Sequence, residues 1–353
     1  MAFTVIDLEG EPYDMGYSFG QQTEEGTHGL AEERCRLSEK RASEAGRRVS
    51  YEDMMRLAAA CLTIQKRALP DVHREFMGIA DGARIPPEEL LIGNGYTDFR
   101  DALVVGTASG LGCTSFVATR PATGDGNTYA GQTWDMDASA ERFVLAVRRK
   151  PRGKPRTISL TTAGCLSLIG MNEVGLTVGN NNLEPRDARP GAIYLAMIHD
   201  ALGRRTLDEA RSAVLDAPRA SGHHYYLADE NGRVAGIETT AERHAELEPN
   251  GGIYVHANHF EAEELQPLAQ APPGENTLHR RRRMEELLSQ ASGQIGPEML
   301  QEFLADGEGG EELSICRHGD VRTCAAAVMC PQTRALWFCL GPPDEGEFEV
   351  IGW

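Results

Sequence analysis

The sequence contains no long apolar run and no export signal. No stretch approaches the ~18 apolar residues that a membrane span requires. The opening Met-Ala-Phe-Thr-Val-Ile-Asp-Leu-Glu also lacks the basic start and apolar segment of a signal peptide. Eight cysteines are spread over 353 residues without a Cys-x-x-Cys pair, and a chain this long can build a core without disulfides. We therefore expect a cytoplasmic protein whose thiols stay reduced and available for chemistry.

Positive charge is scarce as well. Lys and Arg total 35 against 53 Asp and Glu, which gives a net charge of −18. Such a chain is repelled by nucleic acids and by anionic membranes, so we expect neither as a partner. The one basic run, Arg280–Arg283, is followed by Glu285 and Glu286 in a stretch with helical spacing. It is predicted to be a solvated helix face, with an anionic substrate or partner site as the alternative.

Patterns that hold metals or phosphates are missing. The glycine-rich segment 106–112 has no Lys-Ser/Thr of a phosphate loop. The pairs His223-His224 and His256/His259 lack an accompanying Glu-x-x-His or cysteine cluster. Two histidines three apart in a strand also point to opposite faces. We expect no metal and no cofactor.

The sequence changes character near residue 113 but shows no linker, so a single domain 1–353 is predicted. After a short first strand, residues up to about 105 have helical spacing that is broken by Pro70 and by Pro86-Pro87. A flexible loop is expected at 106–112. Later strands are predicted at 113–119, 128–134, 143–149, 157–162, 175–180, 225–228, 233–239, 253–258, 324–329, 335–340 and 348–351, with helices at 192–202, 207–215, 274–291 and 297–305. This order indicates an α+β fold with two sheets between helical layers.

Cys113 begins a predicted hairpin. The segment Gly124-Asp-Gly-Asn127 is typical of a turn between strands. A turn centred on Gly124 places Cys113 opposite Asp135, with Cβ atoms roughly 5 Å apart, although a slip of one residue would undo this pairing. The hairpin therefore predicts a carboxylate beside a thiol.

A thiol needs a base because only the thiolate is a good nucleophile. No histidine lies within this hairpin. The alternative base is an α-amino group, whose pKa of about 8 suits the task and which only a terminal residue carries. Asp135 would then orient the ammonium. The plainer interpretation is that Cys113 is a small buried hydrophobe.

Five short motifs follow one another along the chain: Gly112-Cys113-Thr114, Gly131-Gln-Thr-Trp-Asp135, Gly170-Met-Asn-Glu-Val-Gly-Leu-Thr-Val178, His256-Ala-Asn-His-Phe260 and Ser314-Ile-Cys-Arg-His318. In this order they resemble the acyl-coenzyme A:6-aminopenicillanic-acid acyltransferase family, also called the C45 peptidase family, of N-terminal-nucleophile hydrolases. The opening Gly10-Glu-Pro-Tyr13 and the terminal Cys339-Leu-Gly-Pro-Pro343 fit too. The resemblance spans nearly the whole chain.

The resemblance implies a four-layer αββα sandwich and a precursor that cuts itself between Gly112 and Cys113. An α segment, residues 1–112, and a β segment, residues 113–353, would then stay associated. Cleavage would proceed by attack of the Cys113 thiol on the Gly112 carbonyl, an N-to-S shift and hydrolysis of the thioester. A residue without Cβ tolerates that strained approach.

The family's site residues map onto this sequence by motif. Cys113 corresponds to the nucleophile, Asp135 to the family aspartate and Asn258 to the oxyanion-stabilising asparagine. Arg322 is the best match for a site arginine. Further oxyanion or substrate-binding positions are Asn182, Thr133, where the family usually has asparagine, and His256, expected to pack near Asn258.

The resemblance implies an enzyme that forms an acyl-cysteine thioester. Transfer to water gives an amidohydrolase of a small N-acyl amide or peptide-like compound, which we favour, and transfer to an amine gives an acyltransferase. An unprocessed, non-catalytic binding protein is the competing class. The segment 260–277 should form a pocket wall, but it is acidic and proline-rich without a family match, so the substrate stays open. Association into a homo-oligomer stays open as well.

Overall fold

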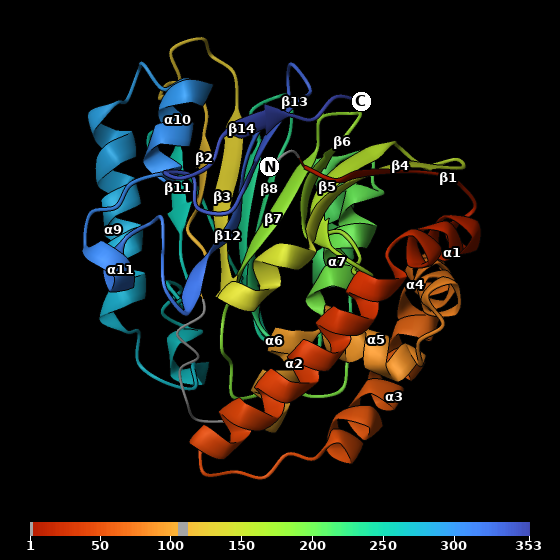
Figure 1. The fold of residues 1–353 in the computed structure, drawn as a ribbon. Coiled ribbons are helices and arrows are strands. Elements are labelled where there is room, and N and C mark those ends of the chain that lie inside the picture. The colour runs from red at the N-terminus through yellow and green to blue at the C-terminus, as the bar shows by residue number, and fades with distance from the viewer. Residues whose placement is uncertain (1–2, 105–111) are drawn as a thin grey trace.

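The computed structural model describes residues 3–104 and 112–353. Within these ranges the strands form two sheets that face each other (Figure 1). The contacts between them run through β2, β3 and β12 of one sheet and β6 and β7 of the other. The glycine-rich segment expected to form a loop, apart from Gly112, lies outside the described residues.

The larger sheet has eight strands in the order β1-β4-β5-β6-β7-β8-β9-β10. Its first strand, which lies far from the others in sequence, pairs in parallel with β4, whereas the remaining neighbours are antiparallel. The strands are β1 (Val5–Gly10), β4 (Val144–Pro151), β5 (Thr157–Thr162), β6 (Ile169–Asn172), β7 (Thr177–Asn182), β8 (His223–Ala228), β9 (Val234–Thr239) and β10 (His244–Leu247).

The smaller sheet has six strands in the order β11-β2-β3-β12-β13-β14, all antiparallel. They are β2 (Ser115–Ala118), β3 (Tyr129–Asp137), β11 (Ile253–His256), β12 (Val321–Cys330), β13 (Ala335–Leu340) and β14 (Phe348–Val350). Within β3 the chain comes so close to β12 that a Cβ at Gly131 would lie 2.4 Å from the carbonyl oxygen of Ala327.

Helices cover the outer face of each sheet. The larger sheet carries α1 (Pro12–Gln22), α2 (Glu24–Glu44), α3 (Tyr51–Ala68), α4 (Pro70–Ala83), α5 (Pro87–Asn94), α6 (Tyr96–Leu103), α7 (Tyr194–Leu202) and α8 (Leu207–Leu215) on its side of the molecule. The smaller sheet carries α9 (Glu275–Gln290), α10 (Pro297–Leu304) and α11 (Gly310–Leu313), with short 3₁₀ turns at Ala138–Phe143 and Gln266–Leu268 elsewhere. The expected four-layer αββα sandwich is confirmed.

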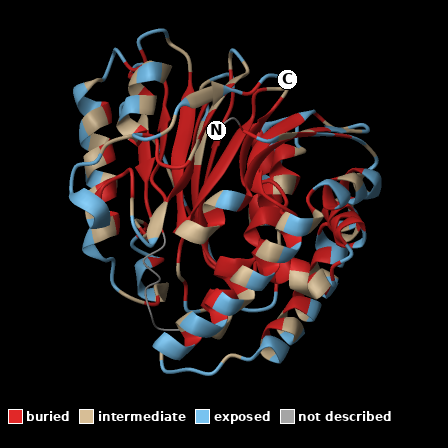
Figure 2. Cartoon of the chain, viewed as in Figure 1, coloured by how far each residue is buried: buried red, intermediate tan, exposed pale blue. Residues whose placement is uncertain are grey.

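Burial follows this layering, as Figure 2 shows: the central strands of both sheets are buried, and the outer helices α2, α3 and α9 expose one side. One apolar cluster fills the space between the sheets and under the first helical layer, and a second packs α9 and α10 onto the smaller sheet through Met284, Leu288 and Leu300. No helix in the described ranges combines the length and apolarity needed to cross a membrane.

Candidate active site

Cys113 lies just before β2, in a register that differs from the predicted one. Gly112, not Cys113, is opposite Asp135, and the Asp135 N–H donates to the Gly112 carbonyl at 3.0 Å. The predicted opposition of Cys113 and Asp135 is therefore wrong by one residue. The reason is that β2 and β3 are joined by a loop over 119–128 and not by a tight turn centred on Gly124.

Cys113 and Asp135 nevertheless line the same small cavity, which has a volume of about 20 Å³. That is room for roughly one water molecule. The wall also includes Asn180, Asn182 and Asn258. Of the predicted site residues, the structure thus brings together Gly112, Cys113, Asp135, Asn182 and Asn258.

The Asp135 carboxylate is fully buried and only half satisfied. Its Oδ1 accepts a hydrogen bond from the Thr323 hydroxyl at 2.8 Å, while Oδ2 has no partner among the described residues. The Oδ1 atoms of Asn180 and Asn182 are likewise buried without partners there. Burial raises the pKa of Asp135, although the positive charges of Arg280 and Arg317 oppose that effect. The cavity therefore presents acceptor oxygens to which a positively charged donor would bind.

The Cys113 thiol is a poor nucleophile in the uncut chain. Burial, and then the charge of Asp135, raise its pKa to about 12. Its backbone is held firmly, because the N–H donates to Asn258 Oδ1 at 2.8 Å and the carbonyl accepts from Asn181 Nδ2 at 3.0 Å. A base at hydrogen-bonding distance would be needed to form the thiolate at neutral pH.

Arg280 is the fully buried arginine at this site. Its Nη1 donates to the Cys113 carbonyl at 2.8 Å, and its Nη2 donates to Asn258 Oδ1 at 2.9 Å. Burial lowers its pKa to about 10, so it stays charged at neutral pH. A Cβ at Gly112 would lie 2.6 Å from its Nη2, so a larger residue there would displace the Arg280 guanidinium.

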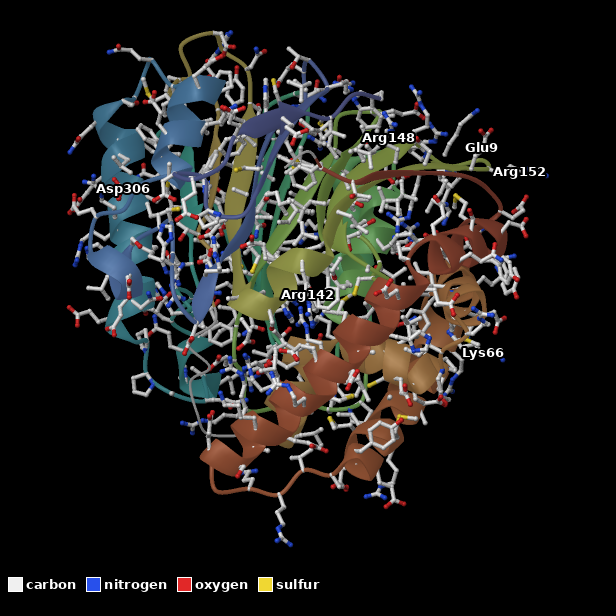
Figure 3. The ribbon with its side chains drawn as sticks, in the orientation of Figure 1. Glu9, Lys66, Arg142, Arg148, Arg152 and Asp306 are labelled. Atoms are coloured by element: carbon white, nitrogen blue, oxygen red, sulfur yellow. The ribbon has the colours of Figure 1, made fainter. Side chains whose placement is uncertain are left out.

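The basic run is thus not a uniform solvated face. Arg280 is buried, whereas Arg281 pairs with Glu261 and Glu285. The Arg283 guanidinium pairs at 2.7 Å with Asp306, which Figure 3 labels beside α9 and α10. The prediction of a solvated face is wrong for Arg280, because a helix that packs on a sheet buries one side chain per turn.

Arg322 does not reach the cavity. Its guanidinium pairs with Glu141 at 3.0 Å and with Glu345 at 3.2 Å near the surface. The second arginine near the site is Arg317, whose charge acts on both Asp135 and Cys113. The signal that could have found it is the Ser314-Ile-Cys-Arg-His318 motif, in which it is the only arginine.

Two further predicted residues lie beside the site without lining the cavity. The Thr133 hydroxyl accepts a hydrogen bond from the Thr114 N–H at 3.1 Å and so ties β3 to β2. His256 is buried between the sheets, where its Nε2 bonds to Glu238 Oε1 at 2.7 Å. His256 thus lies two residues before Asn258 but does not line the small cavity.

His256 belongs to a buried group that we call the Asn181 network: Asn181, His224, Glu238, Tyr254 and His256. The Asn181 Oδ1 bonds to His224 Nδ1 at 2.7 Å, and His224 Nε2 bonds to the Tyr254 hydroxyl at 2.7 Å. The rings of His224 and His256 stack with centroids 3.8 Å apart. Since Asn181 also donates to the Cys113 carbonyl, the network supports the backbone of Cys113.

A wide groove of about 660 Å³ adjoins the site. Asn258 lines both the groove and the small cavity, and Arg280 lies at the inner end of the groove. Much of the remaining wall comes from residues 259–261, 266–267, 271–274 and 276–278, which confirms the expectation that the segment 260–277 forms a pocket wall.

Comparison with known proteins gives a family match and several relatives. The family model described as acyl-coenzyme A:6-aminopenicillanic acid acyl-transferase matches residues 122–345, a range that begins after Cys113. The acyl-coenzyme A:6-aminopenicillanic-acid-acyltransferase 40 kDa form of Emericella nidulans is 26% identical over 263 residues, covering 72% of this chain and 69% of that protein. An uncharacterized protein of Archaeoglobus fulgidus is 22% identical over 307 residues, covering 74% of this chain and 51% of that protein.

Two solved structures have a similar arrangement. A variant of conjugated bile acid hydrolase from Clostridium perfringens superposes with a TM-score of 0.46 at 15% identity, over 68% of this chain and 97% of that chain. Penicillin V acylase from Agrobacterium tumefaciens superposes with a TM-score of 0.41 at 14% identity, over 65% of this chain and 83% of that chain.

Proposed function

The chain belongs to the acyl-coenzyme A:6-aminopenicillanic acid acyl-transferase family, and we propose that it is a self-processing N-terminal-nucleophile enzyme that hydrolyses a small N-acyl amide or peptide-like compound through a thioester on Cys113. The observation that carries this proposal is the buried Oδ2 of Asp135 in the cavity beside Cys113, which has no hydrogen-bond partner within residues 3–104 and 112–353. An α-ammonium on Cys113 would supply the missing cationic donor.

Self-cleavage requires a polarised Gly112 carbonyl and a good leaving nitrogen. The Asp135 N–H already donates to that carbonyl oxygen, and Asn258 Oδ1 holds the Cys113 nitrogen. The thiol sulfur attacks the Gly112 carbonyl carbon, the C–N bond breaks, and the nitrogen leaves as an amine that keeps the thiol proton. Water then hydrolyses the thioester, releasing the Gly112 carboxylate and restoring the thiol.

Turnover reuses the same atoms. The freed amine takes the thiol proton, and Asp135 stabilises the resulting ammonium. The thiolate attacks the substrate carbonyl, whose oxyanion needs N–H donors. Asn258 Nδ2 is suited to this role because it lies at the junction of cavity and groove, where it now donates to the Asn182 carbonyl at 3.0 Å. The amine product leaves, and water releases the acid.

The two segments should remain together after cleavage. β1 of the α segment completes the larger sheet by pairing with β4 of the β segment. A buried ion pair at 2.8 Å also joins Glu75 of the α segment to Arg149 of the β segment. Separating the segments would expose both the strand edge and these charges to water.

An acyltransferase is the second candidate, because the Emericella nidulans relative is an acyltransferase. The two activities use the same nucleophile and base and differ only in the acceptor that meets the thioester. Competition between water and added amines during turnover of an acyl donor would decide between them.

Intact mass measurement tests the proposal without a known substrate. The purified protein should consist of two associated pieces, the larger of which begins Cys-Thr-Ser-Phe-Val. A Cys113→Ala variant should stay as one chain, and a matched Cys330→Ala variant, which alters another buried thiol, should cut normally.

A single uncut wild-type chain with no mass increase after incubation with acyl donors would favour the non-catalytic binding protein. An uncut chain that nevertheless forms an acyl adduct on Cys113 would leave the nucleophile in place and refute the α-amine as its base.

A further inference from the structure

Three metal-binding side chains converge outside the Cys113 cavity. Cys316 and His318 lie in the loop that precedes β12, and Asp344 lies in the turn that follows β13. The Cys316 Sγ is 3.1 Å from Asp344 Oδ1, and His318 Nε2 is 3.0 Å from Asp344 Oδ2. The sulfur and His318 Nε2 are 4.0 Å apart. The proposed reaction uses none of these groups.

These separations are close to those that a tetrahedral ion imposes. Zinc binds sulfur at about 2.3 Å and nitrogen or oxygen at about 2.0–2.2 Å, so its ligand atoms lie about 3.5 Å from one another. The sulfur–nitrogen gap of 4.0 Å is somewhat longer than this value, and the three ligand atoms, with one oxygen of Asp344, lie within 4.8 Å of one another. The shorter gaps run to different oxygens of Asp344, so a rotation of that carboxylate would bring one oxygen to the ion. Thiolate, imidazole and carboxylate are also a donor set that zinc prefers.

The surroundings fit a bound cation. Cys316 is buried, whereas the side chains of His318 and Asp344 are 30% and 39% exposed, so a fourth ligand can come from solvent. The second ring nitrogen of His318 lies 3.6 Å from Glu345 Oε1. A carboxylate behind a histidine is the arrangement that orients metal-ligating imidazoles. Arg322, which pairs with Glu345, is a nearby positive charge that would oppose binding of a cation.

We propose that Cys316, His318 and Asp344 bind a thiophilic divalent cation of the zinc type. Binding replaces the thiol proton, which leaves to solvent. His318 then carries its ring proton on Nδ1, which faces Glu345, and its Nε2 exchanges the hydrogen bond with Asp344 for the metal bond. The cation would tie the loop to the turn after β13.

This loop reaches Asp135. The Arg317 N–H donates to the Thr323 hydroxyl at 2.9 Å, and that hydroxyl donates to Asp135 at 2.8 Å. A cation held by the residues on either side of Arg317 would therefore fix the segment that supports the Asp135 carboxylate. Its role would be to hold structure and not to take part in the reaction.

Cobalt(II) titration of the full chain, stripped of metal with a chelator, tests the site directly. We expect one equivalent to bind with a near-ultraviolet thiolate-to-cobalt charge-transfer band that zinc abolishes. Cys316→Ser should remove the band. His318→Gln and Asp344→Asn, which change partly exposed side chains and keep the thiol, should weaken binding by roughly tenfold or more.

The nucleophile provides the matched control. Cys113→Ala should keep the cobalt band, because Cys113 is not among the proposed ligands. A band that disappears in Cys113→Ala, or that survives unchanged in His318→Gln and Asp344→Asn, would overturn the site, as would the absence of cobalt binding. This readout needs no turnover, so an uncut protein that binds cobalt would refute the proposed function while leaving the metal site standing.

Discussion

Strand β7 separates two polar regions that differ in how fully their hydrogen bonds are made. Asn180 and Asn182 line the Cys113 cavity, and their Oδ1 atoms have no partner among the described residues. Asn181, which points to the other face of the strand, belongs to the Asn181 network. There, every side-chain nitrogen and oxygen, including both oxygens of Glu238, is hydrogen-bonded.

The difference separates a reactive region from a supporting one. A buried polar atom without a partner costs about 1–3 kcal/mol, so several around one cavity indicate a place where another group binds. A fully bonded network instead holds its members in a single arrangement. We infer that the cavity carries the chemistry and that the Asn181 network keeps the backbone of Cys113 in place.

The largest expected effect tests the cavity side of this comparison. Asp135→Asn keeps the shape but loses the carboxylate that would carry the thiol proton to the Cys113 nitrogen during self-cleavage and stabilise the ammonium during turnover, so both should fall by roughly 10³-fold. Stopped time courses of chain cutting, followed by intact mass, measure the loss. Asp137→Asn on the same strand is the control, because that carboxylate pairs with Arg41 away from Cys113; equal cutting by both variants would contradict the assigned role.

The pKa of Asp135 also predicts a pH dependence. Burial raises this pKa in the folded, uncut chain. As pH falls, the carboxylate that self-cleavage needs should therefore be protonated at a higher pH than an ordinary aspartate would be. The folded state then binds the proton more tightly than the unfolded state. Stability should therefore decline as pH rises through the raised pKa. The free energy of unfolding of uncut Cys113→Ala protein, measured by denaturation at a series of pH values, should show this decline. The additional Asp135→Asn change should remove the decline.

The next effect tests the supporting side. Glu238→Gln breaks the buried pair with His256 and should lower the free energy of unfolding by about 3 kcal/mol. Folded protein should still cut itself, because no atom of Glu238 faces the cavity. Urea denaturation measures the change in the free energy of unfolding. Glu261→Gln is the control, since its pair with Arg281 is partly exposed and should be worth less than about 1 kcal/mol.

A pair of neighbouring substitutions sharpens the contrast within β7. Asn181→Ala leaves the Ser115 hydroxyl and His224 Nδ1 without their shared acceptor, and should cost about 2 kcal/mol of stability. Asn182→Ala removes an oxygen that has no described partner, so stability should change little while turnover falls. If Asn182→Ala cost more stability than Asn181→Ala, the division between the two faces of β7 would be wrong.

Much of the fold follows from local sequence. Thr206 and Glu209 have the Thr-x-x-Glu spacing typical of a capping box, and the structure contains this box at the start of α8. The parallel pairing of β1 with β4 has no local signal, because it joins segments more than a hundred residues apart. Periodicity identifies elements, but sheet order depends on packing between them.

The site was only partly predictable, for the same reason. The closeness of Asp135 to Cys113 was predicted from a hairpin with the wrong register. The two residues are nevertheless close together, because both face one cavity at the strand ends. Arg280 looked like one cation in a basic run. Its burial depends on how α9 packs against β11, which no short motif encodes.

The smallest expected effect distinguishes the arginines. Arg322 makes two ion pairs near the surface, so Arg322→Ala should change the free energy of unfolding by less than about 1 kcal/mol and leave self-cleavage unchanged. Arg317→Ala, five residues earlier, removes a charge that acts on Asp135 and should slow cutting. The comparison is made by intact mass at matched times. If the Arg322 variant alone cut more slowly, the surface pairs would be needed to hold β12 in position against β3. The functional region would then extend beyond the cavity.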